Sequence, residues 1–388
     1  MMKTTIKFIL LLIVFFSDID SYGQCVSLDF PVSMTGYQFH DRPTMKLLDD
    51  TLYVCCPDGV YAKDLITEKG WEPCAFKGLR IFDFVKNGDK LLGLGSNASD
   101  DDPSFIVRCE KGGSPIDVTP EELHGFDHNP YLPAFSLDQP LDHLETVILS
   151  TSLGLLVSYD FGNSWEQSPC FKKMDALYYY RTSINPSDPS EVVCYGEEMT
   201  EEGSIYTLKN FEIVSLYNVP DVCQPICDFI FNMEDSWQRC YCAFETFGST
   251  KDGGETWKEI SLPGTFGTLA SKGSDEGTVY IIGRAPVYGP EPTMLQVYQY
   301  RYEDGSWNHC YKCDLPSGMK SFYDAVFWGD ELILLTNVGV FSISDIDKIA
   351  SQTLLPPKDH AVYDISGRKV PTIKSHGIFI QDGKKIVR

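Results

Sequence analysis

The chain has 388 residues, 43% of them hydrophobic and 13% aromatic, so it can bury a core as two ordinary domains or as one large all-β domain. It carries 55 acidic against 32 basic residues, for a formal net charge of −23. A field of that sign repels phosphate backbones, so composition excludes nucleic acid as an expected partner.

Residues 1–24 have the pattern of a cleaved export signal. Two lysines precede an apolar run at 8–16 that is too short to span a bilayer, and small residues precede a cut before Gln24. We expect a mature chain that is secreted or held at the outer cell surface, with no transmembrane segment. Cys25 raises a lipoprotein alternative, which the large Gln24 side chain before it disfavours.

All 13 cysteines follow the export signal, and their number is odd. Close pairs at 223–227 and 310–313 permit a thiolate zinc site, which needs four ligands. The alternative is a set of buried free thiols that behave as small apolar residues, with one or two disulfides. We favour the buried thiols, and we predict no metal site.

A strand–glycine–strand pattern recurs along the chain. Its second strands begin 91 to 95 residues apart, and each gap holds one fainter copy. The strong copies start at Thr51, Thr146, Arg239 and Glu331, and the fainter ones lie near Ile106, Ile205 and Val297. The chain therefore contains seven copies with a period of about 42 to 50 residues, which is the length of one four-stranded propeller blade.

These copies predict an all-β fold, a seven-bladed β-propeller with four-stranded antiparallel blades over residues 25–356. The fourth copy, for example, resolves into an innermost strand at 176–184 followed by three more strands. The seventh copy lacks an outer strand. We predict that residues 25–33 supply it and close the ring, the alternative being a free N-terminal arm.

Two stretches share one motif, "SYDFGNSW" at 158–165 and "STKDGGETW" at 249–257. The glycines tolerate positive φ in a turn, the aspartate accepts bonds from backbone N–H groups, and the tryptophan buries its ring between sheets. We place both at the turn between the third and fourth strands of their blades. The structural residues are Asp160, Gly162, Trp165, Asp252, Gly254 and Trp257.

This motif resembles the Asp box, or BNR repeat, of sialidases, sortilin-type receptors and xyloglucanases. The "NPSDP" turn at 185–189 adds to the likeness. The resemblance covers 25–356 by architecture but only about twenty residues by motif. It implies that the Asp box is scaffold at the blade periphery, away from the face that carries catalysis in those families.

Aspartates on or near the predicted innermost strands are the candidate catalytic residues. Asp83, Asp228 and Asp324 recur at the same place in blades two, five and seven, and Asp138 lies on the third. Two such carboxylates would serve a glycosidase, and a ring of them would bind a sugar or a structural cation. The interpretations that we favour are hydrogen bonding at the strand ends or a solvated channel, and no cofactor is expected.

The candidate ligand-binding residues are Tyr178, Tyr180, Arg181 and Arg284. Alternate residues of a strand face opposite ways, so at most two of the three consecutive tyrosines share a face. They would form a sugar-binding platform, or the tyrosines would pack between blades. The early Arg-Ile-Pro signature of sialidases is absent, since the nearest match at 79–82 lacks the proline.

The composition changes after residue 356, and residues 358–388 hold seven Lys or Arg against three Asp. Two strand-like segments predict a short C-terminal β-hairpin over 357–388. This tail resembles the sorting tails of Bacteroidetes proteins exported by type IX secretion, although it is shorter. The alternative is a small hairpin docked on the propeller.

The sequence thus predicts a monomeric, exported or surface propeller that binds a glycan or a protein without catalysis. The first alternative is a sialidase-like or xyloglucanase-like glycoside hydrolase acting at the channel mouth. The second is an envelope assembly factor.

Overall fold

The computed structural model describes most of the chain between residues 25 and 346 and four short strands beyond. The described ranges are 25–37, 41–67, 69–96, 104–124, 134–152, 154–170, 177–198, 203–219, 225–272, 275–285, 294–344, 346, 362–364, 369–370, 378–381 and 384–387. Apart from the helical turn α2 (Glu121–His124), the regular structure in these ranges is almost entirely β-strand.

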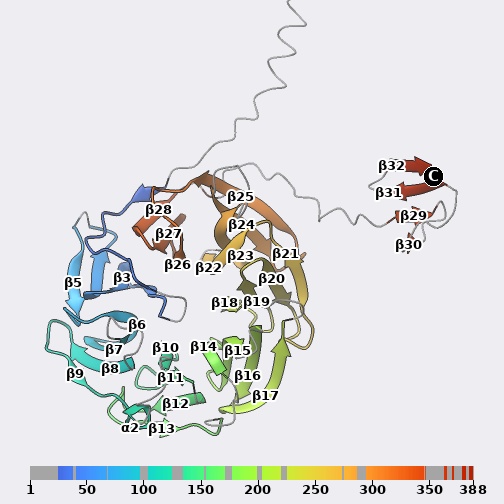
Figure 1. Cartoon of the computed structure of the whole chain (residues 1–388). Coiled ribbons are helices and arrows are strands. Elements are labelled where there is room, and N and C mark those ends of the chain that lie inside the picture. The colour runs from blue at the N-terminus through green and yellow to red at the C-terminus, as the bar shows by residue number, and fades with distance from the viewer. Residues whose placement is uncertain are drawn as a thin grey trace, which may run out of the picture.

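Seven antiparallel four-stranded sheets stand as blades around a common hub (Figure 1). Six blades follow chain order from hub to rim, and the seventh takes its rim strand from the N-terminal region. The predicted all-β, seven-bladed propeller is therefore confirmed.

The blades run from innermost to outermost strand as follows. Blade 1 is β2 (Met45–Leu48), β3 (Thr51–Cys56), β4 (Gly59–Asp64) and β5 (Glu72–Ala75); blade 2 is β6 (Ile81–Asn87), β7 (Lys90–Ser96), β8 (Ser104–Glu110) and β9 (Ile116–Asp117); blade 3 is β10 (Ala134–Asp138), β11 (Val147–Thr151), β12 (Gly154–Ser158) and β13 (Glu166–Gln167); blade 4 is β14 (Leu177–Ile184), β15 (Glu191–Glu198), β16 (Gly203–Lys209) and β17 (Glu212–Asn218). Blade 5 is β18 (Ile226–Phe231), β19 (Arg239–Ala243), β20 (Thr246–Thr250) and β21 (Lys258–Ser261); blade 6 is β22 (Thr265–Lys272), β23 (Asp275–Ala285), β24 (Met294–Arg301) and β25 (Trp307–Asp314); blade 7 is β26 (Phe322–Trp328), β27 (Glu331–Thr336), β28 (Gly339–Ile343) and β1 (Val26–Ser27).

The ring closes through the N-terminal strand, as the sequence predicted. Strand β1 pairs antiparallel with β28, with Val26 opposite Ser342 and Ser27 opposite Phe341. The N–H of Leu28 then donates to the carbonyl of Val340 at 2.9 Å. The two ends of the propeller therefore meet in one sheet, which Figure 1 shows as a blue strand beside β28.

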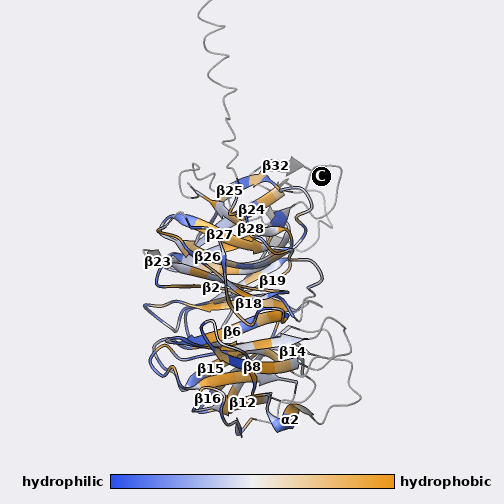
Figure 2. Ribbon diagram, turned by 90° about the vertical axis from the view of Figure 1, so that its left-hand side faces the viewer, coloured by the Kyte–Doolittle hydropathy of each residue, from blue (hydrophilic) through white to orange (hydrophobic). Residues whose placement is uncertain are grey.

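Each pair of neighbouring blades is held together by its own apolar cluster, and there are seven such clusters. Between blades 2 and 3, for example, Phe82 and Leu94 pack with Leu137 and Leu149. Viewed edge-on, hydrophobic residues run along the strands of the stack (Figure 2). Burial of both faces of each sheet is the main stabilisation that ring closure provides.

The described cysteines are mostly part of these clusters. Twelve are described, all with free thiols, and eleven of them are buried. They pack as small apolar residues between blades, which is the interpretation favoured from the sequence. The thirteenth, Cys223, lies outside the described residues.

The two repeated motifs at 158–165 and 249–257 occupy matching turns, between β12 and β13 and between β20 and β21. Asp252 accepts bonds from the N–H of Thr256 at 2.9 Å and from its hydroxyl at 2.5 Å. Hydrogen bonds from Thr250 and Thr256 lower the pKa of Asp252 to about 2. Asp160 accepts the same two bonds from Ser164, at 2.8 and 2.7 Å.

Glycine and tryptophan complete each corner. Gly162 and Gly254 have φ of +79° and +96°, which a residue with a side chain rarely adopts. The indole of Trp165 donates to the carbonyl of Val118 in the preceding blade at 3.3 Å. Trp257 packs against Tyr217 of its preceding blade, with ring centroids 5.5 Å apart. Both indoles therefore tie an outer corner to the neighbouring blade.

The C-terminal tail differs in one respect from its prediction. Its described residues form four short strands in the order β30 (Lys369–Val370), β29 (Val362–Asp364), β31 (Ile378–Gln381) and β32 (Lys384–Val387). The expected hairpin is therefore a small antiparallel sheet, because each half of the tail folds back on itself. In the described part of the chain, no helix has the length and apolarity needed to cross a bilayer.

Replacing Leu28 with proline tests the closing strand. The substitution removes the N–H that bonds to Val340, so we expect the free energy of unfolding to fall by about 1–2 kcal/mol. Leu28→Ala keeps that N–H and serves as the control in chemical denaturation. If the two variants were equally stable, the closing hydrogen bond would contribute nothing.

Truncating the Asp252 carboxylate tests the role of this turn. Asp252→Ala leaves the Thr256 N–H without its acceptor, so we expect a loss of about 1–2 kcal/mol of unfolding free energy. The neighbouring exposed Glu255 gives the matched control Glu255→Ala. Unchanged stability of Asp252→Ala would argue against a scaffold role.

Candidate functional site

The candidate carboxylates line the hub at equivalent positions. In β6, β18 and β26 the pairing register shifts immediately before Asp83, Asp228 and Asp324, which is the mark of a bulge. A bulge leaves a backbone N–H without its ladder partner and turns the side chain that follows. The three aspartates predicted to be equivalent therefore share one local geometry, whereas Asp138 lies two residues past the shift in β10.

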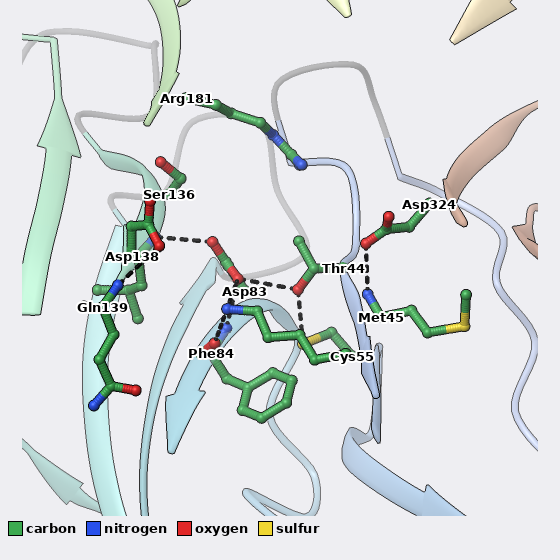
Figure 3. A network of polar contacts seen from close by, with 12 residues as sticks. Thr44, Met45, Cys55, Asp83, Phe84, Ser136, Asp138, Gln139, Arg181 and Asp324 are labelled. Carbon is green, nitrogen blue, oxygen red and sulfur yellow. Dashed lines mark hydrogen bonds and ion pairs between the residues drawn. The ribbon is translucent and has the colours of Figure 1, made fainter. Parts of the chain in front are cut away.

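Each of these carboxylates bridges its own blade to the next. Asp83 accepts the N–H of Phe84, its own neighbour, at 2.8 Å with Oδ1 and the N–H of Leu137, in blade 3, at 2.8 Å with Oδ2. Figure 3 shows this carboxylate between the two strands. The equivalent donors, at 2.8–2.9 Å, are Phe229 and Leu269 for Asp228, and Ala325 and Met45 for Asp324.

Hydroxyl groups from neighbouring blades extend this network. Thr44 donates to Asp83 at 3.0 Å, and Thr268 donates to Asp228 at 3.1 Å. Between blades 3 and 4 a hydroxyl takes the place of the carboxylate, because the N–H of Thr182 donates to Oγ of Ser136 at 3.2 Å. The hub is thus lined by a polar ring whose members bond from blade to blade.

Two buried arginines cross the hub above this ring. Arg181, on β14, donates to the backbone carbonyl of Arg42 at 2.7 Å, and Figure 3 shows it reaching toward that loop. Arg42, in the loop before β2, donates to the carbonyl of Gly267 in blade 6 at 2.6 Å. Both side chains are less than a tenth exposed. Together they connect blades 1, 4 and 6 and offset the charge of the hub carboxylates.

Burial changes the acidity of two hub carboxyl groups. Desolvation raises the pKa of Asp324 to about 6, and the negative charge of Asp228 acts in the same direction. Desolvation likewise raises the pKa of Asp138 to about 6, opposed by Lys46. Both pKa values rise because a poorly hydrated hub disfavours the charged form of a carboxyl group.

The hydrogen bonds of these carboxylates fit a role in holding the blades together better than a role in acid–base catalysis. A glycosidase needs two carboxyl groups free to reach a substrate across a cleft, whereas Asp83, Asp228 and Asp324 each accept two backbone N–H groups. Among the described residues, no group of three or more His, Cys, Asp or Glu side chains is arranged to hold a metal ion.

A cavity of about 250 Å³ opens beside the hub, where the innermost strands of blades 5, 6 and 7 begin. Because strands alternate in direction, this face is opposite the turns that carry Asp160 and Asp252. Three cationic side chains line it, with tyrosine, phenylalanine and hydroxyl groups, and no carboxylate is among its described lining residues. Its residues are Tyr37, Arg42, Cys227, Phe244, Thr265, Gly267, Arg284, Lys320, Ser321, Phe322 and Tyr323. We call it the mouth pocket.

The structure brings only part of the predicted ligand set together. Arg284 lines the mouth pocket, and Arg181 holds the loop of Arg42 that also lines it. Tyr180 is 1% exposed and packs on Tyr206 between blades, so its ring offers no face to a sugar. The side chain of Tyr178 lies outside the described residues.

Sequence reasoning missed Arg42 and Lys320, two of the three cations in the mouth pocket. Both lie in loops that lead into an innermost strand, β2 and β26. Their position just before these strands was the available indication, because such loops border the channel mouth in a propeller.

No protein-family model matches the chain, and no curated protein matches it. It is similar in fold to several solved structures. A GH74 enzyme from Niastella koreensis has a TM-score of 0.60 at 12% identity, over 88% of this chain and 57% of the enzyme, so this chain spans little more than half of it. Virginiamycin B lyase from Staphylococcus aureus has a TM-score of 0.54 at 10% sequence identity, and the match covers 82% of this chain and 97% of the lyase. A chain of a mitotic checkpoint complex has a TM-score of 0.56 at 6% sequence identity, and the match covers 83% of this chain and 94% of that chain.

These likenesses establish the class of protein, a seven-bladed β-propeller. The identities are too low to carry more than the fold, and the similar structures include both enzymes and a component of a protein assembly. Function therefore has to be argued from the side chains of this chain.

The raised pKa of Asp324 predicts how stability changes with pH. Between about pH 4 and pH 6 the native carboxyl keeps a proton that the unfolded chain releases, so this group favours the fold at low pH. Its contribution is lost as pH rises through 6. Asp324→Asn cannot titrate, so its unfolding free energy will fall less between pH 5 and pH 7 than that of the wild type in chemical denaturation.

The exposed Asp49 provides a control, since Asp49→Asn should keep the wild-type pH dependence. Identical slopes for Asp324→Asn and wild type would show that Asp324 is not protonated in this range.

Proposed function

We propose that this protein is a propeller that binds a glycan or a protein at the mouth pocket without catalysing a reaction. The observation that carries the proposal is the separation of charges. Hub carboxylates are engaged in bonds between blades, while Arg42, Arg284 and Lys320 line an open cavity without a carboxylate among its described residues.

The lining also favours a class of ligand group. Guanidinium groups pair with planar acids through charge-assisted hydrogen bonds. Aromatic side chains such as Tyr37, Phe244 and Tyr323 supply apolar contact beside them. A sugar ring or peptide carrying a carboxylate or sulfate therefore suits this pocket better than a neutral ligand.

A glycoside hydrolase is the alternative, prompted by the fold likeness to the GH74 enzyme. It would need Asp228 or Asp324 to leave its backbone partners and reach substrate. Release of reducing sugar or sialic acid from a glycan panel, lost in a folded Asp228→Asn protein, would support it and overturn the binding proposal.

We further propose that the chain is exported, with residues 1–24 as the signal and 357–388 as a tail of the type IX kind. The Asp-box geometry supports placing it beside the BNR-repeat propellers, since Asp160 and Asp252 make identical sets of bonds. An envelope assembly factor is the second alternative. Isolation of a stoichiometric protein complex from the native envelope, with no glycan binding, would favour it.

Binding of glycans to the purified protein tests the proposal. Acidic glycans, uronic or sulfated, should bind in titration calorimetry, and neutral ones of the same length should bind more weakly. Arg284→Ala should weaken binding about tenfold, equivalent to about 1.4 kcal/mol, because it removes one charged partner. Rising salt should weaken it further.

The exposed Lys69 lies outside the pocket, so Lys69→Ala is the matched loss of positive charge. If Arg284→Ala and Lys69→Ala bound equally well, the mouth pocket would not be the binding site.

A further inference from the structure

Two cysteines meet at the seam of the ring. Cys25 directly precedes β1, the closing strand of blade 7, and Cys313 lies on β25, the outer strand of blade 6. Their sulfur atoms are 3.4 Å apart, although 288 positions separate them in the chain. Both side chains pack on the apolar cluster between blades 6 and 7.

Strand pairing at the seam is short. Strand β1 contributes two residues to the sheet, Val26 and Ser27, and Val26 is 50% exposed. Within the same blade, by comparison, β26 and β27 pair over six residues and β27 and β28 pair over five. A covalent link beside β1 would therefore reinforce the point where the two ends of the ring are joined by only two paired residues.

We propose that Cys25 and Cys313 form a disulfide that locks the ring when the protein meets an oxidising thiol–disulfide environment. The oxidant is a disulfide, either of a small thiol or of an oxidoreductase. Cys25–SH and Cys313–SH together with R–S–S–R give the Cys25–Cys313 disulfide and two R–SH, so two hydrogens and two electrons pass to the oxidant.

The geometry suits this exchange. Cys25 is partly exposed, so an external disulfide reaches its sulfur first and forms the mixed disulfide there. Cys313 is 2% exposed and lies next to that sulfur, in position to attack it and release the second R–SH. The sulfurs then approach from contact distance to a bond of about 2.05 Å.

Cys310, three residues earlier on the same strand, is the nearest competitor in sequence. Its thiol donates to the carbonyl of Val297 within blade 6, at 3.3 Å, and so is directed toward its own sheet. The structure therefore assigns the bond to Cys313.

The experiment uses the chain with residues 1–24 removed, treated with glutathione disulfide or with a reductant. Oxidation should make the protein two hydrogens lighter, and a non-reducing digest should give one peptide pair joined through Cys25 and Cys313. The oxidised form should melt about 5 °C higher than the reduced form. In Cys25→Ser the oxidant should change neither mass nor melting temperature, and Cys310→Ser should behave as wild type.

Because Cys313 is buried, its replacement risks misfolding, and the partly exposed Cys25 is the safer site to change. The proposal is overturned if Cys25 remains open to alkylation after oxidation, or if it links to another cysteine. A bond that forms without raising the melting temperature overturns the locking role. If Cys25 carries a lipid in protein from the native host, its sulfur cannot form a disulfide, and the proposal as a whole is overturned.

Discussion

The propeller depends on how its innermost strands are joined around the hub. Each innermost strand is the edge strand of its sheet on the hub side, so N–H groups that face the poorly hydrated hub have no further strand to bond to, and such groups are costly unless they are bonded. Asp83, Asp228 and Asp324 accept those N–H groups and, with their second oxygen, the matching N–H of the next blade. One carboxylate thereby satisfies two strands and fixes their relative height. Apolar clusters between blades hold the sheets together but are less directional, so the ring of polar contacts sets the register.

This arrangement decides where recognition can take place. Carboxylates that would otherwise be candidates for catalysis are used in holding blades together, and Arg42 and Arg181 fill the space above them. The mouth pocket, in contrast, is an open cavity beside a hydrogen-bond donor that has no partner among the described residues. Nε of Arg42 is buried without a hydrogen-bond partner among the described residues, in a cavity that Arg284 and Lys320 also line. A strongly acidic protein thus presents a local cationic cavity, which is the physical basis for expecting an acidic ligand group.

Much of the fold was predictable because it is repeated. A strand–glycine–strand pattern seen seven times gave the number of blades, and the missing outer strand of the last copy pointed to residues 25–33. The equivalence of Asp83, Asp228 and Asp324 was also visible, because they follow the same strand pattern. The partners of these carboxylates were not visible, since Asp324 bonds to Met45 from the other end of the chain. The role of Arg42 was not predicted for the same reason, because the carbonyl of Gly267 that accepts its hydrogen bond is distant in sequence. For Tyr180 the sequence left two alternatives open, a binding platform or packing between blades, because strand alternation alone does not tell the hub side from the side facing the next blade.

The most direct test of this account is the unfolding free energy of Asp83→Asn compared with that of Asp89→Asn, an exposed residue in the adjoining turn. An asparagine keeps the shape but presents an NH₂ group to one of the two N–H donors. We expect Asp83→Asn to lose about 2–4 kcal/mol, because a buried donor is left unpaired, and Asp89→Asn to stay within about 0.5 kcal/mol of wild type. An Asp83→Asn protein as stable as wild type would contradict the claim that the hub carboxylates hold the blades together.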